Sequence, residues 1–301
     1  MTKQKLIVVL GQTATGKSDL AVRLAKKYNG EVISADSRQV YKGLDIGTGK
    51  ITKSEMKGIP HHVLDVVSPK KQFSIAEYKK LAEEAIANII SRGKIPILCG
   101  GTGFYIQAIV DGIVLPKVAP NMKLRKHLNN KTTKQLYAIL KKLDLRRARE
   151  IDKNNPRRLI RAIEIATSLG KIPHLAVSPP SGDILQIGLK LTDAELKKKI
   201  TIRLFARISR GMINEARNLL HRHIISFVRM RELGLEYKYL AKYLKGELGK
   251  KEMIEQLETA IWHYAKRQKT WFKRDKRIRW FDVSKKDARQ KIEKEVIKFL
   301  K

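Results

Sequence analysis

Eight consecutive residues near the N-terminus have the types and spacing needed to hold phosphate. They fit the pattern GxxxxGK[ST] without a mismatch: Gly11, Gln12, Thr13, Ala14, Thr15, Gly16, Lys17 and Ser18. In this pattern backbone N–H groups surround phosphate oxygens, the lysine adds a positive charge, and the final hydroxyl can ligate Mg²⁺. A helix that begins at Lys17 adds the positive end of its dipole. The segment therefore predicts a P-loop, with Mg²⁺ as cofactor and Ser18 as its protein ligand.

Two more polar residues follow apolar runs that are typical of strands. Asp36 comes directly after residues 31–35, and Thr102 stands in the Gly-Gly-Thr-Gly turn that follows residues 95–99. In open α/β sheets ligands bind at the carboxyl ends of the strands, so we expect both residues beside the P-loop. A carboxylate there can take a proton or hold a metal, and a hydroxyl can donate to a departing phosphate oxygen. Each also has a structural explanation, Asp36 as a helix N-cap and Thr102 as a turn residue.

The acidic residue that a nucleoside triphosphatase uses to hold Mg²⁺ at the end of a later strand is missing from residues 95–101. The P-loop is therefore better suited to a diphosphate leaving group than to a triphosphate used as fuel. His61 and His62 are adjacent and lack a third ligand, which makes them a poor metal site and favours a structural role.

The elements that must position these residues alternate between strands and helices. Four short apolar runs, residues 6–10, 31–35, 95–99 and 184–191, are typical of buried parallel strands. Helical periodicity predicts helices over residues 17–28 and 75–91, the second capped by Ser74. This order predicts an α/β fold, a P-loop NTPase-like parallel sheet with helices on both faces.

The rest of the chain shows helical patterns. Residues 118–180 carry helical runs at 136–145 and 156–169, and predict a helical insertion. Residues 1–117 and 181–301 would form the P-loop core with a helical C-terminal part, in which the clearest runs are 193–220 and 252–272.

The charge of the chain indicates a polyanionic partner. Its 64 Lys and Arg against 29 Asp and Glu give a formal charge of +35, and most of the excess lies after residue 115. Such an excess is typical of nucleic-acid-binding proteins. The basic run 266–279 and the aromatic residues Trp271, Phe272 and Trp280 are candidates for contacts with RNA phosphates and bases, although burial in the core is the more common role of such aromatic residues.

Membrane and secretory signals are absent from the sequence. No apolar run approaches the length of a spanning helix, and residues 6–10 are too short for a signal peptide. The single cysteine, Cys99, excludes an internal disulfide. We therefore expect a cytoplasmic protein, with a monomer as the default assembly.

Six segments, taken in order, carry a resemblance to one family. Residues 11–18, 33–50, 58–69, 100–106, 144–165 and 264–272 together resemble the tRNA dimethylallyltransferases, also called tRNA isopentenyltransferases. The resemblance implies transfer of a dimethylallyl group from dimethylallyl diphosphate to N6 of the adenine at position 37, next to the anticodon, in tRNAs that read codons beginning with U. The products would be N6-(dimethylallyl)adenosine and diphosphate.

The resemblance also implies roles for individual residues. Asp36 would be the general base at N6, Thr102 would face the bridging oxygen of the diphosphate, and Arg203 would face the diphosphate. Ser37, Arg38 and Gln39 would contact the target base and its neighbours, together with Asp36 and Thr102. The anticodon stem-loop would meet Arg125, Arg157, Arg158, Leu159, Ile160 and Arg161.

The chain departs from the family pattern at several positions. Gln12 replaces the usual proline of the P-loop, Lys199 an arginine, and Arg207 a methionine, while Ile261 and Trp262 replace a Thr-Arg pair.

Three other functions share some of these features. A P-loop small-molecule kinase using ATP explains the loop and Mg²⁺ but not the charge. A non-catalytic RNA-binding module with a nucleotide switch explains the charge but gives Asp36 and Thr102 no role. Transfer onto free adenine nucleotides needs no such basic surface.

Overall fold

A computed structural model describes residues 4–174, 176–178 and 182–301. The chain divides into two compact units, residues 1–111 with 179–301, and residues 112–178. The predicted limits of the second unit were residues 118 and 180. Among the described residues, no helix combines the length and apolar character that crossing a membrane requires.

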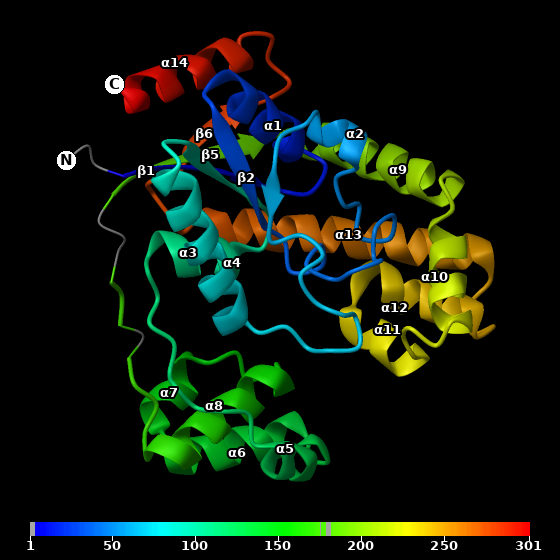
Figure 1. The fold of residues 1–301 in the computed structure, drawn as a ribbon. Coiled ribbons are helices and arrows are strands. Elements are labelled where there is room, and N and C mark those ends of the chain that lie inside the picture. The colour runs from blue at the N-terminus through cyan, green and yellow to red at the C-terminus, as the bar shows by residue number, and fades with distance from the viewer. Residues whose placement is uncertain (1–3, 175, 179–181) are drawn as a thin grey trace. The chain divides into compact units, whose positions relative to one another are not determined.

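The larger unit is built around a six-stranded sheet (Figure 1). Its strands are β1 (Lys5–Gly11), β2 (Gly30–Ala35), β3 (His61–His62), β4 (Ile95–Gly100), β5 (Asp183–Lys190) and β6 (Arg279–Asp282). They lie in the order β3-β2-β4-β1-β5-β6, and every neighbouring pair is parallel. The predicted parallel α/β sheet is confirmed, and the central strand β1 leads directly into the predicted P-loop.

The helices of the larger unit cover both faces of this sheet. Alternate residues of β1 point to opposite faces, as the period of a strand requires: Leu6 and Val8 join one apolar cluster, and Ile7 and Val9 join the other. The second cluster is completed by α1 (Lys17–Lys27) and α14 (Ala288–Leu300). The first is completed mainly by α3 (Ile75–Ser91), α4 (Gly103–Val110), α9 (Asp193–Ser209), α10 (Met212–His221), α11 (Phe227–Leu233), α12 (Leu235–Leu244) and α13 (Lys250–Phe272).

Several predicted elements agree with the structure within one or two residues. Helix α3 begins at its predicted cap, where Ser74 and Glu77 form a reciprocal capping box. The predicted run 193–220 is instead two helices, α9 and α10, because Gly211 adopts φ 98° between them.

The prediction that everything after residue 191 is helical is wrong at β6. This four-residue strand lies at the edge of the sheet and has side chains that are half-buried or exposed, and β5 is its one partner among the described strands. An edge strand of this kind shows no apolar run in the sequence. The basic residues before it fit a helical pattern, so the predicted helical region included the strand.

The described part of the smaller unit contains four helices, α5 (Met122–Asn129), α6 (Thr133–Leu143), α7 (Leu145–Glu150) and α8 (Pro156–Leu169). They enclose a separate apolar core. The predicted run 136–145 ends early because Asp144 leaves the helical conformation and caps α7 by accepting a hydrogen bond from the backbone N–H of Arg147 at 2.8 Å. The short helix α2 (Lys53–Met56), which belongs to the larger unit, was not predicted.

Candidate active site

The P-loop lies between the end of β1 and the start of α1, as its sequence pattern requires. Gly11 adopts φ 141°, and a Cβ there would lie 2.4 Å from the carbonyl oxygen of Leu189 in β5, so only glycine fits. Ala14 and Gly16 also have positive φ values, 61° and 87°. These conformations turn the chain sharply into the N-terminus of α1, where backbone N–H groups are free to bind an anion.

The lysine of the loop is surrounded by charged groups. Its Nζ donates to the carbonyl oxygen of Gln12 at 2.6 Å. Removal from water lowers the pKa of Lys17 to about 8, Cys99 and Asp36 raise it, and Arg203 lowers it further. Lys17 therefore interacts electrostatically with both Asp36 and Arg203.

Asp36 and Thr102 lie together at the carboxyl edge of the sheet. The backbone N–H of Ser37 donates to Thr102 Oγ1 at 3.0 Å, and the backbone N–H of Thr102 donates to the carbonyl oxygen of Ala35 at 3.1 Å. Asp36 Oδ1 accepts from the backbone N–H of Arg38 at 2.8 Å. In the described part of the chain Asp36 Oδ2 has no partner. One carboxylate oxygen therefore fixes the turn, and the other is available to receive a proton.

Arg203 reaches this site from helix α9. Its Nη2 donates to the carbonyl oxygen of Gly49 at 3.0 Å, and Gln39 Nε2 approaches the same oxygen at 3.3 Å. Burial lowers the pKa of Arg203, followed by repulsion from Arg207, whereas Glu236, Asp36 and Glu55 raise it. An arginine held in a partly desolvated place is well suited to bind an anion strongly.

The segment that carries Gly49 is held by side chains from the C-terminal helices. Glu215 accepts from the backbone N–H groups of Asp45, Ile46 and Gly47. Arg207, which is buried, donates to the carbonyl oxygens of Ile46 and Gly47.

The replacement of the family's methionine by Arg207 is accommodated by an acid. Arg207 Nη2 donates to Glu236 Oε1 at 2.8 Å, so its buried charge is paired. The arginine at position 207 therefore adds hydrogen bonds to residues 46–47 that a methionine side chain could not donate.

Sequence reasoning assigned no role to two residues of α13 that contact the site. Gln268 contacts both the P-loop and the Gly100–Gly101 turn. Tyr264 lies one turn earlier; burial and then Asp36 raise the pKa of its phenol, whereas the Thr102 hydroxyl lowers it. Both residues fall in segment 264–272, whose resemblance to the family was the available signal.

The residues present fit a magnesium ion held mainly by substrate oxygens. Ser18 is exposed at the start of α1, and its hydroxyl has no partner in the described residues. No group of three or more His, Cys, Asp and Glu side chains able to hold a metal occurs among those residues. Mg²⁺ commonly takes one or two protein ligands together with phosphates and waters, so a single hydroxyl suits it.

The arginines predicted to contact tRNA in the smaller unit differ in their surroundings. Arg125 and Arg161 both pair with Glu164, whose side chain is 1% exposed; Arg125 Nη2 lies 2.8 Å from Glu164 Oε2. Arg157 and Arg158 are exposed near the start of α8, and neither side chain has a partner in the described part of the chain. Arg157 and Arg158 are therefore free to bind phosphate, whereas Arg125 and Arg161 hold the fold together.

Leu159 and Ile160 differ from the basic residues beside them. Their side chains are 0% and 8% exposed and lie in the apolar core of the smaller unit. They follow Arg158 on α8, and their side chains pack in the core of the smaller unit.

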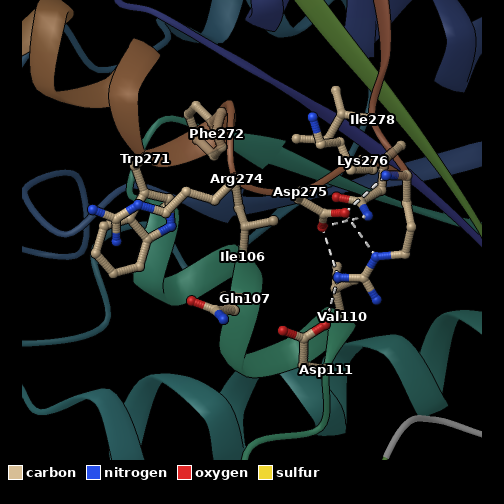
Figure 2. A pocket seen from close by; sticks show the side chains of 13 residues that line it. Ile106, Gln107, Val110, Asp111, Trp271, Phe272, Arg274, Asp275, Lys276 and Ile278 are labelled. Carbon is tan, nitrogen blue, oxygen red and sulfur yellow. Dashed lines mark hydrogen bonds and ion pairs between the residues drawn. The ribbon is translucent and has the colours of Figure 1, made fainter. Parts of the chain in front are cut away.

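The basic run 266–279 borders a cavity in the larger unit of about 290 Å³. Figure 2 shows Arg274 beside Trp271, with the guanidinium carbon 5.7 Å from the ring centroid. Arg277 instead pairs with Asp111 and Asp275, at 2.6 Å from each. Phe272 is buried and Trp271 and Trp280 are partly buried against the core, so the aromatic residues of the run serve packing first.

Comparison with known proteins gives consistent matches over nearly the whole chain. Residues 39–275 match the family described as IPP transferase. The chain is 41% identical over 294 residues to the tRNA dimethylallyltransferase of Halothermothrix orenii, and the aligned region covers 95% of this chain and 89% of the relative. A second tRNA dimethylallyltransferase, from Thermoanaerobacter sp., is 40% identical over 309 residues, covering 98% of this chain and 97% of the relative.

Two solved structures have a similar fold. The tRNA isopentenylpyrophosphate transferase of Bacillus halodurans matches with a TM-score of 0.75 and 36% identity, over 99% of this chain and 97% of that chain. A eukaryotic dimethylallyltransferase, described as acting on tRNA, matches with a TM-score of 0.80 and 30% identity, over 94% of this chain and 76% of that chain.

Proposed function

The chain belongs to the IPP transferase family, and from this premise we propose that it transfers a dimethylallyl group from dimethylallyl diphosphate to N6 of an adenine in tRNA. One observation carries the proposal to particular residues. A phosphate-binding loop, a carboxylate with one free oxygen and a hydroxyl share one edge of the sheet, and a desolvated arginine from α9 interacts electrostatically with the lysine and the carboxylate there. The relatives described above are tRNA-modifying transferases by name, so the kinase alternative has no support.

The adenine nitrogen needs a base because its lone pair is delocalised into the ring. In the proposed reaction, N6 attacks C1 of the dimethylallyl group while the bond from C1 to the diphosphate oxygen breaks. Asp36 Oδ2 takes the proton that N6 loses, and the bonding electrons leave with the diphosphate. General base catalysis of this kind contributes roughly 10²- to 10⁴-fold.

The departing diphosphate is the group that gains most negative charge. The P-loop N–H groups, Lys17, Arg203 and the Thr102 hydroxyl would surround it, and donors placed where charge develops are worth about 3 kcal/mol each. Mg²⁺ at Ser18 would supply further charge neutralisation when bound.

The target adenine must leave the anticodon stack to reach a site at the sheet edge. We assign it to position 37 of tRNAs that read codons beginning with U, with Ser37, Arg38 and Gln39 beside it. Arg157 and Arg158 would bind phosphates of the anticodon stem-loop, which accounts for part of the +35 charge. Action as a cytoplasmic monomer is consistent with this role.

The proposal is tested by incubating the protein with Mg²⁺, dimethylallyl diphosphate and unmodified tRNA, then digesting the RNA for mass spectrometry of nucleosides. A prenylated adenosine is expected with tRNA and not with free adenine nucleotides. Consumption of ATP with a small-molecule acceptor, and no prenylated adenosine, would support a kinase instead.

A further inference from the structure

One buried side chain joins the two loops between which the diphosphate is proposed to bind. Gln268 of α13 is 5% exposed. Its Oε1 accepts from the backbone N–H of Thr13 at 2.8 Å, and its Nε2 donates to the carbonyl oxygen of Gly101 at 2.9 Å. Thr13 belongs to the P-loop, and Gly101 directly precedes Thr102. The two loops therefore meet at the two ends of a single amide group.

The amide is planar and rigid, so these two bonds fix the separation of the loops. The fit is close, because a Cβ at Gly101 would lie 2.3 Å from Gln268 Nε2. The contact is also specific to an amide, since Thr13 presents a donor and Gly101 an acceptor. Only a side chain with one acceptor and one donor at this spacing satisfies both.

A second glutamine ties the P-loop to the same turn of α13. Gln12 is 2% exposed, and its Nε2 donates to the carbonyl oxygen of Ala265 at 3.1 Å. Its own carbonyl oxygen accepts from Lys17 Nζ and from Thr15 Oγ1. Gln12 thus anchors the loop to the helix, and of the two glutamines it is Gln268 that also contacts the turn carrying Thr102.

We propose that Gln268 is a positioning residue, which sets the distance between the P-loop and the Thr102 turn so that both can bind one diphosphate. The inference rests on the proposed function for the identity of the ligand. It follows that Gln268 controls affinity for the diphosphate group and not affinity for RNA. Loss of both hydrogen bonds at once leaves a buried donor and a buried acceptor without partners, which moves the loops apart.

The test uses inorganic pyrophosphate with Mg²⁺, measured by titration calorimetry on the full chain. Gln268→Met keeps the shape of the side chain and removes both hydrogen bonds without adding charge. The matched control is Gln186→Met, because the Gln186 side chain is also buried, at 4% exposure, and within the described residues it makes one hydrogen bond, to Asp275 at 3.0 Å. We expect Gln268→Met to weaken pyrophosphate binding about tenfold, and Gln186→Met to leave it unchanged.

Kinetics separate positioning from general loss of structure. Gln268→Met should raise the KM for dimethylallyl diphosphate and lower kcat, with the KM for tRNA unchanged. A fall only in the fraction of active protein, with unchanged pyrophosphate affinity, would overturn the inference. If Gln268→Met fails to fold, Gly101→Ala provides the test, because the added Cβ displaces the Gln268 amide from the turn. Unchanged pyrophosphate affinity in Gly101→Ala would also overturn the inference.

The pyrophosphate-binding test of Gln268 can fail or succeed independently of the prenyl-transfer test of the proposed function. Pyrophosphate binding requires no transfer and no RNA. A chain that binds pyrophosphate through Gln268 yet forms no prenylated adenosine would refute the transferase and leave the positioning role intact.

Discussion

The backbone N–H of Ser37 donates a hydrogen bond to the hydroxyl oxygen of Thr102 over 3.0 Å. This bond joins the turn after β2, which carries the proposed base Asp36, to the turn after β4, which carries the proposed donor to the leaving group. Because β2 and β4 are neighbouring parallel strands, both turns lie at the same edge of the sheet. The hydrogen bond holds one turn against the other. The proton acceptor and the leaving-group donor are therefore positioned together.

The Thr102 hydroxyl is expected to act on the leaving group. Thr102→Val keeps the branched shape and removes the hydroxyl, and should lower kcat by roughly 10²-fold, the usual cost of one donor to developing charge. Thr102→Ser retains the hydroxyl and should keep most of the activity. Rapid-quench measurement of prenyl transfer to tRNA distinguishes the two. Equal activity of the valine and serine variants would remove Thr102 from the mechanism.

Pyrophosphate affinity should depend on the ionisation of Lys17. Removal from water lowers the pKa of Lys17 to about 8 in the free protein, so the amine loses its charge as pH rises through that value. Affinity for pyrophosphate should therefore decline between about pH 7 and pH 9 as the charge on Lys17 is lost.

Lys17→Arg provides the control, because arginine stays charged over this range. Titration calorimetry at several pH values should give a smaller decline for the arginine variant, and identical profiles would contradict the assignment. The same pKa shift has a consequence for stability. The unfolded chain binds more protons at this lysine between about pH 8 and 10.5, so its contribution to stability rises with pH there.

Much of the site was predictable because its motifs are local. The P-loop pattern needs only a strand before it and a helix after it. Asp36 and Thr102 follow apolar runs that are typical of strands. Gln268 was not predictable from spacing, because its partners Thr13 and Gly101 lie far from it in the sequence. Contacts between a distant helix and two loops leave no periodic signal.

Exposed arginines of the smaller unit should contribute to tRNA affinity by binding phosphates. The double variant Arg157→Ala and Arg158→Ala should weaken tRNA binding and reduce the salt dependence of log K by up to about 1.8, because each phosphate that an arginine neutralises adds about 0.9 to the slope. Filter binding over a range of KCl concentrations measures the slope. An unchanged slope with unchanged affinity would show that these residues do not meet RNA.

Arg125 should matter for stability before it matters for RNA. Arg125→Ala leaves the buried Glu164 with fewer partners, and should lower the free energy of unfolding of the smaller unit by about 3 kcal/mol. Thermal melting followed by circular dichroism measures the change, with Arg157→Ala as an exposed control that should melt like the wild type. Equal melting of both variants would contradict the structural role.

The acid dependence of this pair has a defined sign. Burial alone would raise the pKa of Glu164, but hydrogen bonds from Arg125 and Arg161 lower it to about 2. Its contribution to stability is therefore present above pH 4.5 and is lost as pH falls towards 2.

The sequence pattern could not separate these arginines because all of them are basic residues near helical runs. Their difference comes from Glu164, which is buried on α8 and pairs with Arg125 and Arg161. Leu159 and Ile160 were grouped with their basic neighbours for the same reason, although helical periodicity places apolar residues on the inner face.

Single-turnover transfer by Asp36→Asn tests the central claim most directly. The asparagine keeps an oxygen that can accept from the backbone N–H of Arg38 but cannot take a proton, so the turn survives and the base is lost. The experiment mixes excess enzyme with dimethylallyl diphosphate and unmodified tRNA, and follows prenylated adenosine by mass spectrometry. We predict a rate lower by roughly 10²- to 10⁴-fold, with pyrophosphate and tRNA affinity within about twofold of the wild type. A variant that transfers the prenyl group at the wild-type rate would contradict the assignment of Asp36 as the base.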